Sequence, residues 1–467
     1  MLEKLRVIFF SIPELRQKII LTLLLLAIFR VGSQVTLPMV KPDVIASKGE
    51  GEGFAKIIQQ VSVLSASQLD QATIFGLGIM PYISASIILQ LLGQVWKPLE
   101  ELRKEGESGR RKINEYTRYL TVVLCFIQSW TYLAYFLLAR SGNDPPEMIA
   151  SSFLDMREGS WTYNSLGFGW QLTAVMIMTC GTIFLMWLGE QIDEYGIGNG
   201  ISILIMAGIL ARMPAAFQKL FSETSMELGS LTGGRMTIDK IIVLIVLFVS
   251  VVVGVVFITL GQRRIPTQSA KHVKGRRVFG GNRQFLPLRI NQSGVMPIIF
   301  ASTMLAIPTT LFQWLAQGTS NWNNGVSGFF ETLRVSFLSP ESFVHVATFV
   351  ALIFFFCFFW TAITFNPKEI AENLRDFGSF IPGYRPGKRT EEYLSKVMER
   401  ITYVGAGFLS MVAIVPTVVS GFLSVDSVIA GFYGGTSLLI AVSVAFDLVQ
   451  KIDNHLVMRE YRGLLED

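Results

Sequence analysis

The sequence predicts an all-α polytopic membrane protein, and three observations lead to this fold class. Of the 467 residues, 51% are hydrophobic and only 16% are charged, whereas soluble domains are about a quarter charged. The mean hydropathy of +0.47 agrees with this deficit of charge. Apolar runs such as Ile241 to Leu260 are long enough to cross a hydrocarbon core of about 30 Å as a helix. These features argue against a soluble protein.

Apolar windows of about 19 residues predict ten membrane-spanning helices. The windows cover residues 19–38, 74–95, 119–139, 170–189, 198–213, 238–260, 295–316, 343–365, 401–420 and 429–449. The first run leads to Arg30 and not to a cleavage site, so we expect it to be retained as a span. The fifth window follows the glycine-rich residues 196–200, which favour a break where the chain enters the membrane.

Lys and Arg residues predict the orientation, because basic loops stay in the cytoplasm. With the N-terminus inside, the cytoplasmic segments hold 29 of these residues and the opposite loops hold 10. Both termini are therefore predicted to be cytoplasmic.

Two cytoplasmic loops, 262–292 and 366–400, are far longer than the usual median of about 5 residues, and we expect both to project from the membrane. The alternating pattern around the arginines of 262–278 favours a hairpin that presents charge to a partner, although a purely topogenic role stays open.

An internal similarity links the second span to the seventh. Gly78 to Ser86 aligns with Gly294 to Ser302, with Gly, Met, Pro, Ile, Ala and Ser in common. Five spans in each half would place the halves in opposite orientations, and inverted repeats commonly enclose a pathway. Gly followed by Pro interrupts the backbone hydrogen bonds, which is tolerated at membrane depth only beside protein or a water-filled cavity. An ordinary pair of kinked packing helices is the alternative.

Several functions are disfavoured by what the predicted spans lack. No Asp, Glu or His lies deep in a span, which argues against an ion-coupled transporter. No protease motif is present, and residues 383–390 lack the spacing of a phosphate loop, so ATP-driven work would need a partner. Cys125, Cys180 and Cys357 lie in apolar stretches without metal or disulfide spacing, and we expect them to be buried and inert. We expect no cofactor, no metal site and no enzyme activity.

Six motifs then identify a family resemblance. They are the residues 75–86, 104–112, 186–191, 196–202, 365–367 and 434–440, in this order along the chain. With these motifs the sequence resembles the SecY family, the channel subunits of the bacterial Sec protein translocon, over essentially the whole chain. The resemblance implies a multi-pass protein of the bacterial plasma membrane. It also implies ten helices in two pseudo-symmetric inverted halves, 1–219 and 220–467, around a central pore.

The resemblance implies the residues of the pore as well. Its narrow ring would consist of Ile79, Ile83, Ile201, Ile205, Ile299 and Ile440. Each of these taken singly would be interpreted as core packing or as lipid-facing. A ring of branched aliphatic side chains excludes water and blocks ions, yet it offers only weak contacts to a moving polypeptide. The exterior segment 57–72 would hold the plug, a short helix beneath the ring, with a plain surface helix as the alternative.

Signal peptides and nascent spans are apolar, so the resemblance implies a lateral gate through which they leave into membrane lipid. The gate would lie between spans two and three on one side and seven and eight on the other. Ser84, Gln128 and Ser302 are the polar candidates at this seam, and ordinary hydrogen bonding between helices is the alternative.

The implied partners are SecE, which clamps the halves, SecG, the SecA ATPase, the ribosome, signal peptides and preproteins. Arg276, Arg277 and Arg385 match functional arginines of the two long loops. Guanidinium groups suit carboxylates on a motor and phosphates of ribosomal RNA equally, so the sequence leaves that choice open. The leading hypothesis is a channel for unfolded secretory polypeptides, driven by a motor or ribosome. An inverted-repeat solute transporter and a structural membrane scaffold are the competing hypotheses.

Overall fold

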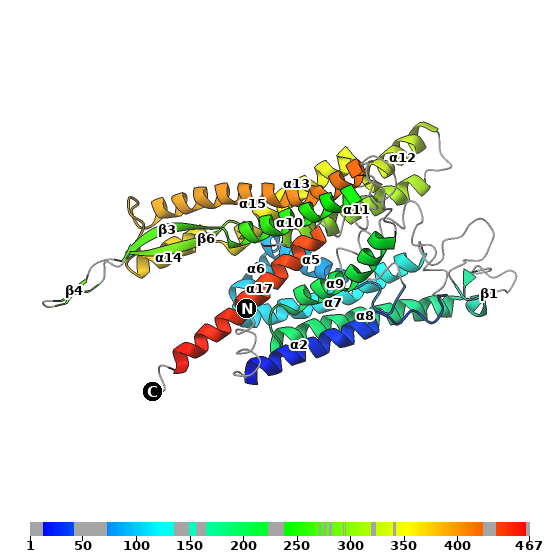
Figure 1. The fold of residues 1–467 in the computed structure, drawn as a ribbon, viewed down its shortest axis with the longest axis horizontal. Helices are drawn as coiled ribbons and strands as arrows, with labels where there is room; N and C mark the ends of the chain where they lie inside the picture. The colour runs from blue at the N-terminus through cyan, green and yellow to red at the C-terminus, as the bar shows by residue number, and fades with distance from the viewer. Residues whose placement is uncertain are drawn as a thin grey trace. The chain divides into compact units, whose positions relative to one another are not determined.

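Long α-helices dominate the computed structural model of the protein (Figure 1). It describes residues 13–41, 72–134, 149–155, 165–222, 238–269, 272–274, 277–279, 283–292, 294, 296–318, 324–339, 342–423 and 436–463. The predicted plug segment, 57–72, lies outside the described residues except for Ala72.

The helices have the following bounds: α2 Pro13–Gly32, α5 Met80–Val95, α6 Lys97–Lys104, α7 Glu107–Tyr132, α8 Phe168–Tyr195, α9 Gly200–Ser222, α10 Ile238–Leu260, α11 Met296–Gly318, α12 Asn324–Leu338, α13 Phe343–Thr364, α14 Pro367–Asp376, α15 Lys388–Leu423 and α17 Thr436–Gly463, with a 3-10 turn at Ser151–Phe153. The strands are β1 Leu154–Asp155, β2 Ser165–Leu166, β3 Gln262–Ser269, β4 His272–Lys274, β5 Arg277–Phe279, β6 Arg283–Arg289 and β7 Ser379–Phe380.

Each of the ten predicted spans overlaps one of these helices. Within the described part of the chain, four helices are long and apolar enough to cross a membrane by themselves. They lie within Phe168–Tyr195, Asp239–Leu260, Phe343–Asp376 and Lys388–Val415. Three shorter apolar helices are Met80–Gly93, Gly200–Pro214 and Met296–Leu305. The number of ten membrane crossings therefore stays a prediction.

The chain folds into two compact units. The first comprises Met1–Phe217 with Val444–Asp467, and the second comprises Gln218–Ser443. The predicted inverted symmetry between the halves 1–219 and 220–467 is not tested by the division into these two units, and it stays a prediction.

In the first unit, α7 packs between α5 and α8 through small side chains. Thr117, Thr121, Cys125 and Ser129 recur every four residues and form a buried stripe. The hydroxyl groups of both threonines donate to carbonyls of their own helix, Thr117 to Ile113 at 2.8 Å and Thr121 to Thr117 at 2.6 Å. Such small residues let helices approach closely inside a membrane.

The predicted hairpin of the second unit is confirmed for the strands β3 and β6. These strands pair antiparallel, with Gln262 opposite Arg289, and β7 adds a third strand at the β3 edge. Alternation along β3 buries Ile265 and Thr267 and leaves Pro266 exposed. The helices α14 and α15 run alongside the strands β3 and β6 (Figure 1). Sheet and helices share a core that comprises Ile265, Leu288, Phe365, Ile381, Leu394, Val397, Met398 and Ile401.

One expectation from the sequence is wrong. Cys180 is exposed on α8, whereas Cys125 and Cys357 are buried as expected. Hydropathy cannot separate an apolar position that faces other helices from one that faces outward, which explains the error. The long segment predicted at 366–400 contains α14, β7 and the first turns of α15.

Candidate functional site

The two similar Gly-Xaa-Met-Pro segments adopt the same local geometry. Gly78 and Gly294 have φ values of +58° and +63°, in the left-handed region that favours glycine. The helices α5 and α11 begin two residues later, and each has Pro as its second residue. Proline is favoured in the first turn because its missing N–H would have no helical partner there. The predicted second span, 74–95, is therefore corrected: residues 72–79 form turns, and the helix begins only at Met80.

Phe75 anchors the turns that precede α5. Its ring stacks between Phe29 of α2 and Phe184 of α8, with ring centroids 6.4 and 5.9 Å away. Gly32 leaves room for this ring, since a Cβ at Gly32 would lie 2.1 Å from the Phe75 ring carbon Cε2. The helices α2 and α8 of the first unit thus fix the segment from which α5 begins.

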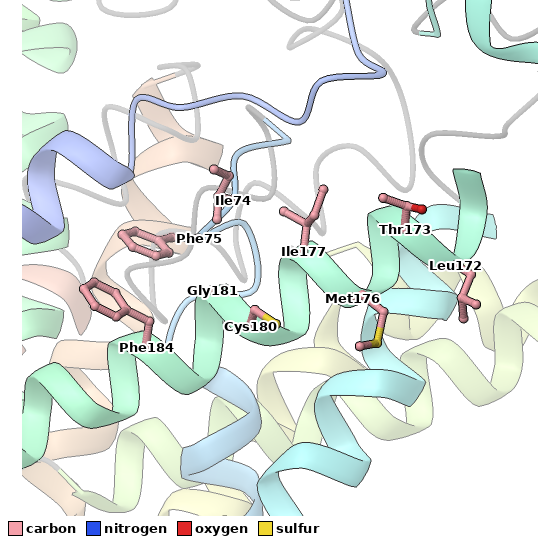
Figure 2. A pocket seen from close by; sticks show the side chains of 9 residues that line it. All are labelled: Ile74, Phe75, Leu172, Thr173, Met176, Ile177, Cys180, Gly181 and Phe184. Atoms are coloured by element: carbon pink, nitrogen blue, oxygen red, sulfur yellow. The ribbon is translucent and has the colours of Figure 1, made fainter. Parts of the chain in front are cut away.

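Beside this anchor, one face of α8 lines an apolar hollow of about 520 Å³. Figure 2 shows Ile74 and Phe75 lying over α8 near Gly181. A Cβ at Gly181 would lie 2.3 Å from the carbonyl oxygen of Ile74, so glycine is required for this approach. The hollow contains Cys180 and no charged side chain.

The glycine-rich residues 196–200 do break the chain between two helices, as predicted. Gly198 has a φ of +99°, and α9 begins at Gly200. The amide of Gly200 donates to the Asp193 carboxylate at 2.8 Å, and the amide of Ser202 donates to the Asn199 side chain at 3.0 Å. The amide of Ile197 donates to the hydroxyl of Thr22 at 3.2 Å. These bonds hold the first turn of α9 in a defined place within the first unit.

The predicted ring isoleucines fall into two groups. In the first unit, Ile79 lies just before α5, Ile83 lies in its first turn, and both are buried. Ile205 of α9 is buried, and Ile201 is half-buried. In the second unit, Ile299 and Ile440 are buried in α11 and α17. A ring formed by all six stays a prediction.

The predicted gate residues are half-buried. Ser84 and Gln128 lie on α5 and α7, which pack against each other. Ser302 of α11 donates to the carbonyl of Ile299 in its own helix at 2.9 Å. Sequence reasoning missed Gln90, whose amide nitrogen donates to Ser86 at 3.0 Å. The side-chain oxygen of Gln90 is buried and has no hydrogen-bond partner among the described residues.

The predicted docking arginines differ in their surroundings. Arg276 lies outside the described residues, and Arg277 stands opposite Lys274 in the small β4–β5 ladder. Arg385 is exposed at the tip of a turn between β7 and α15, flanked by Gly383 and Gly387 with φ values of +92° and +105°.

In the described part of the chain, no group of His, Cys, Asp or Glu side chains could hold a metal ion.

Comparison with known proteins decides the family. Residues 73–449 match the family model described as SecY. The chain belongs to the SecY family. The protein translocase subunit SecY of Thermotoga maritima is 39% identical over 461 residues, which cover 98% of this chain and 96% of that protein. SecY of Escherichia coli K12 is 39% identical over 457 residues, covering 98% of this chain and 95% of that protein.

Solved structures share the SecY fold. A protein-conducting channel matches with a TM-score of 0.57 and 18% identity, covering 95% of this chain and 93% of that chain. Canine Sec61, from a ribosome-channel complex, matches with a TM-score of 0.55 and 18% identity, with the same coverage. The predicted SecY family and the all-α membrane-protein fold class are confirmed.

Proposed function

We propose that the chain is the channel subunit of a bacterial protein translocase in the plasma membrane, with both termini cytoplasmic. In this function it passes unfolded secretory polypeptides through the membrane and releases apolar spans sideways into lipid. The observation that carries the proposal is the nearly full-length similarity to two translocase subunits, each 39% identical to this chain. The inverted-repeat solute transporter has no such support.

The pore ring is proposed to combine Ile79, Ile83, Ile201 and Ile205 from one half with Ile299 and Ile440 from the other. Two helix starts with the same Gly-Xaa-Met-Pro pattern and similar glycine φ values, one in each unit, support this arrangement, because they place Ile83 and Ile299 in the first turns of α5 and α11. A constriction of branched aliphatic side chains excludes water, so it blocks ions without a charged gate. The segment 57–72 is proposed to act as the plug.

Lateral release is proposed to occur at a seam between the predicted spans two and three on one side and the predicted spans seven and eight on the other. Hydrogen bonds between helices in a membrane contribute about 0.6 to 2 kcal/mol each, so a few polar residues can adjust how easily such a seam opens. Ser84, Gln128 and Ser302 are the proposed residues, and Gln90 joins them because its buried side-chain oxygen lacks a partner among the described residues.

The driving force is proposed to come from partners, with SecE and SecG as companion membrane subunits. The loop 262–292 holds eight Lys and Arg and no Asp or Glu, whereas 366–400 holds seven basic and six acidic residues. A uniformly cationic hairpin suits the phosphates of ribosomal RNA, and the mixed charge near Arg385 suits a protein such as the SecA motor. Canine Sec61 and yeast Ssh1, both similar in fold, were solved with ribosomes.

A vesicle assay tests the proposal. The purified chain is reconstituted with its companion subunits, and the SecA motor, ATP and a precursor with a signal peptide are added outside. We expect the precursor to become protected from added protease, and we expect no protection without the chain or without ATP. Uptake of small solutes in place of precursor would favour the transporter. The absence of any movement would favour the structural scaffold.

A further inference from the structure

The exposed turn that carries Arg385 is fixed from within its own backbone. The hydroxyl of Thr390 donates to the carbonyl oxygen of Arg385 at 2.9 Å. The amide of Thr390 donates to Gly387 at 2.9 Å, and the amide of Tyr384 donates to Ile381 at 3.0 Å. Thr390 is only 2% exposed, although it lies beside an exposed turn. Hydrogen bonds therefore hold the backbone on both sides of Arg385.

An aromatic pair adds a second constraint on the same turn. The rings of Tyr384 and Tyr393 have centroids 4.2 Å apart and are tilted by 30°. Tyr393 belongs to α15 and packs against the core of the second unit. The residue before Arg385 is thus in contact with a long helix, and this contact restricts the movement of the turn.

The side chain at the tip is left available for a partner. The guanidinium of Arg385 is exposed, and within the described part of the chain no hydrogen bond or ion pair involves it. A flexible turn would lose conformational entropy on docking, and that loss would weaken binding. A turn that is already ordered avoids this loss, so its internal contacts contribute to docking without touching the partner.

We propose that Thr390 and the Tyr384–Tyr393 pair are positioning residues, which hold Arg385 in the conformation that meets an anionic group of the motor. This inference rests on the proposed function, because it assumes that Arg385 docks the motor.

Four variants separate the two contacts. Thr390→Val keeps the shape of the side chain and removes only the hydroxyl. Thr390→Ser keeps the hydroxyl and is the matched control. Tyr384→Leu removes the ring contact, and Tyr384→Phe retains it.

The test measures precursor transport into vesicles as the concentration of the SecA motor is varied. We expect Thr390→Val and Tyr384→Leu to raise the motor concentration for half-maximal transport about three- to tenfold, the effect of losing one modest interaction. The maximal rate should stay close to that of the wild type. Thr390→Ser and Tyr384→Phe should restore the wild-type value.

A double-variant cycle separates positioning from general stability. In an Arg385→Ala background, Thr390→Val should cause no further rise, because no guanidinium remains to be positioned. An additive effect, a change in maximal rate alone, or no change for both Thr390→Val and Tyr384→Leu would overturn the inference. If those two variants behave like the wild type while Arg385→Ala weakens docking, the positioning role alone fails. If the wild-type channel moves no precursor, the proposed function fails together with the inference.

Discussion

Arg118 of α7 and Glu190 of α8 form a two-point ion pair. The Nε atom of Arg118 lies 2.8 Å from Oε1 of Glu190, and Nη2 lies 2.8 Å from Oε2. This parallel arrangement fixes the relative position of the two groups as well as attracting them. Both side chains are partly exposed, so the ion pair adds little stability. Its main effect is to fix how α7 and α8 align along their lengths.

Charge reversal tests this ion pair. We expect Arg118→Glu to lower the free energy of unfolding by about 1 kcal/mol, since two carboxylates would then face each other at a partly exposed site. The double variant Arg118→Glu with Glu190→Arg should recover most of the loss. Thermal unfolding in detergent measures both. Additive losses in the double variant would contradict the pairing.

The glycine at the start of α9 gives a sharper prediction. A Cβ at Gly200 would lie 2.0 Å from the backbone oxygen of Gly189, which cannot move aside as a side chain can. We therefore expect Gly200→Ala to destabilise the protein by about 1–3 kcal/mol or more. Gly93→Ala is the matched control, because a Cβ at Gly93 meets nothing within 4 Å. It should be neutral or stabilise α5 by about 0.5–1 kcal/mol, since Ala favours helix over Gly. Equal melting temperatures for the two variants would disprove the close approach.

Reversal of the charge at Arg385 tests docking. We expect Arg385→Glu to impair motor-driven transport strongly, because it places repulsion where an anionic partner docks. The free energy of unfolding should change by less than about 0.5 kcal/mol, since the side chain is exposed. Lys41→Glu, an equal change at an exposed site outside both long loops, is the control. Normal transport by Arg385→Glu at normal channel abundance would exclude the docking role.

The sequence predicted features that depend on local pattern. Alternation in 262–278 indicated the hairpin, and the glycines of 196–200 indicated the break before α9, because both reflect preferences of neighbouring residues. Hydropathy placed the start of the second span too far toward the N-terminus, because it carries no information on the left-handed backbone conformation of Gly78.

Long-range contacts escaped prediction for a different reason. The stacking of Phe75 between two helices and the pairing of Arg118 with Glu190 join residues far apart in the chain. Each of these residues is of a common type with no distinctive spacing, so no local pattern marks its partner. The exposure of Cys180 was missed because outward and inward faces of a membrane helix are both apolar.

The last prediction concerns the seal of the resting channel. Ile83 and Ile205 are buried in the first unit, and we propose that they line the narrow ring. Replacing both with Ser should let water enter the constriction, because exclusion of water depends on apolar bulk. We expect a rise in ion conductance of planar bilayers that contain the variant, without motor or precursor. Ile242→Ser is the matched control, since Ile242 is 55% exposed on α10, away from its packed face. Conductance equal to that of the control, with both proteins inserted in equal amounts, would remove Ile83 and Ile205 from the ring.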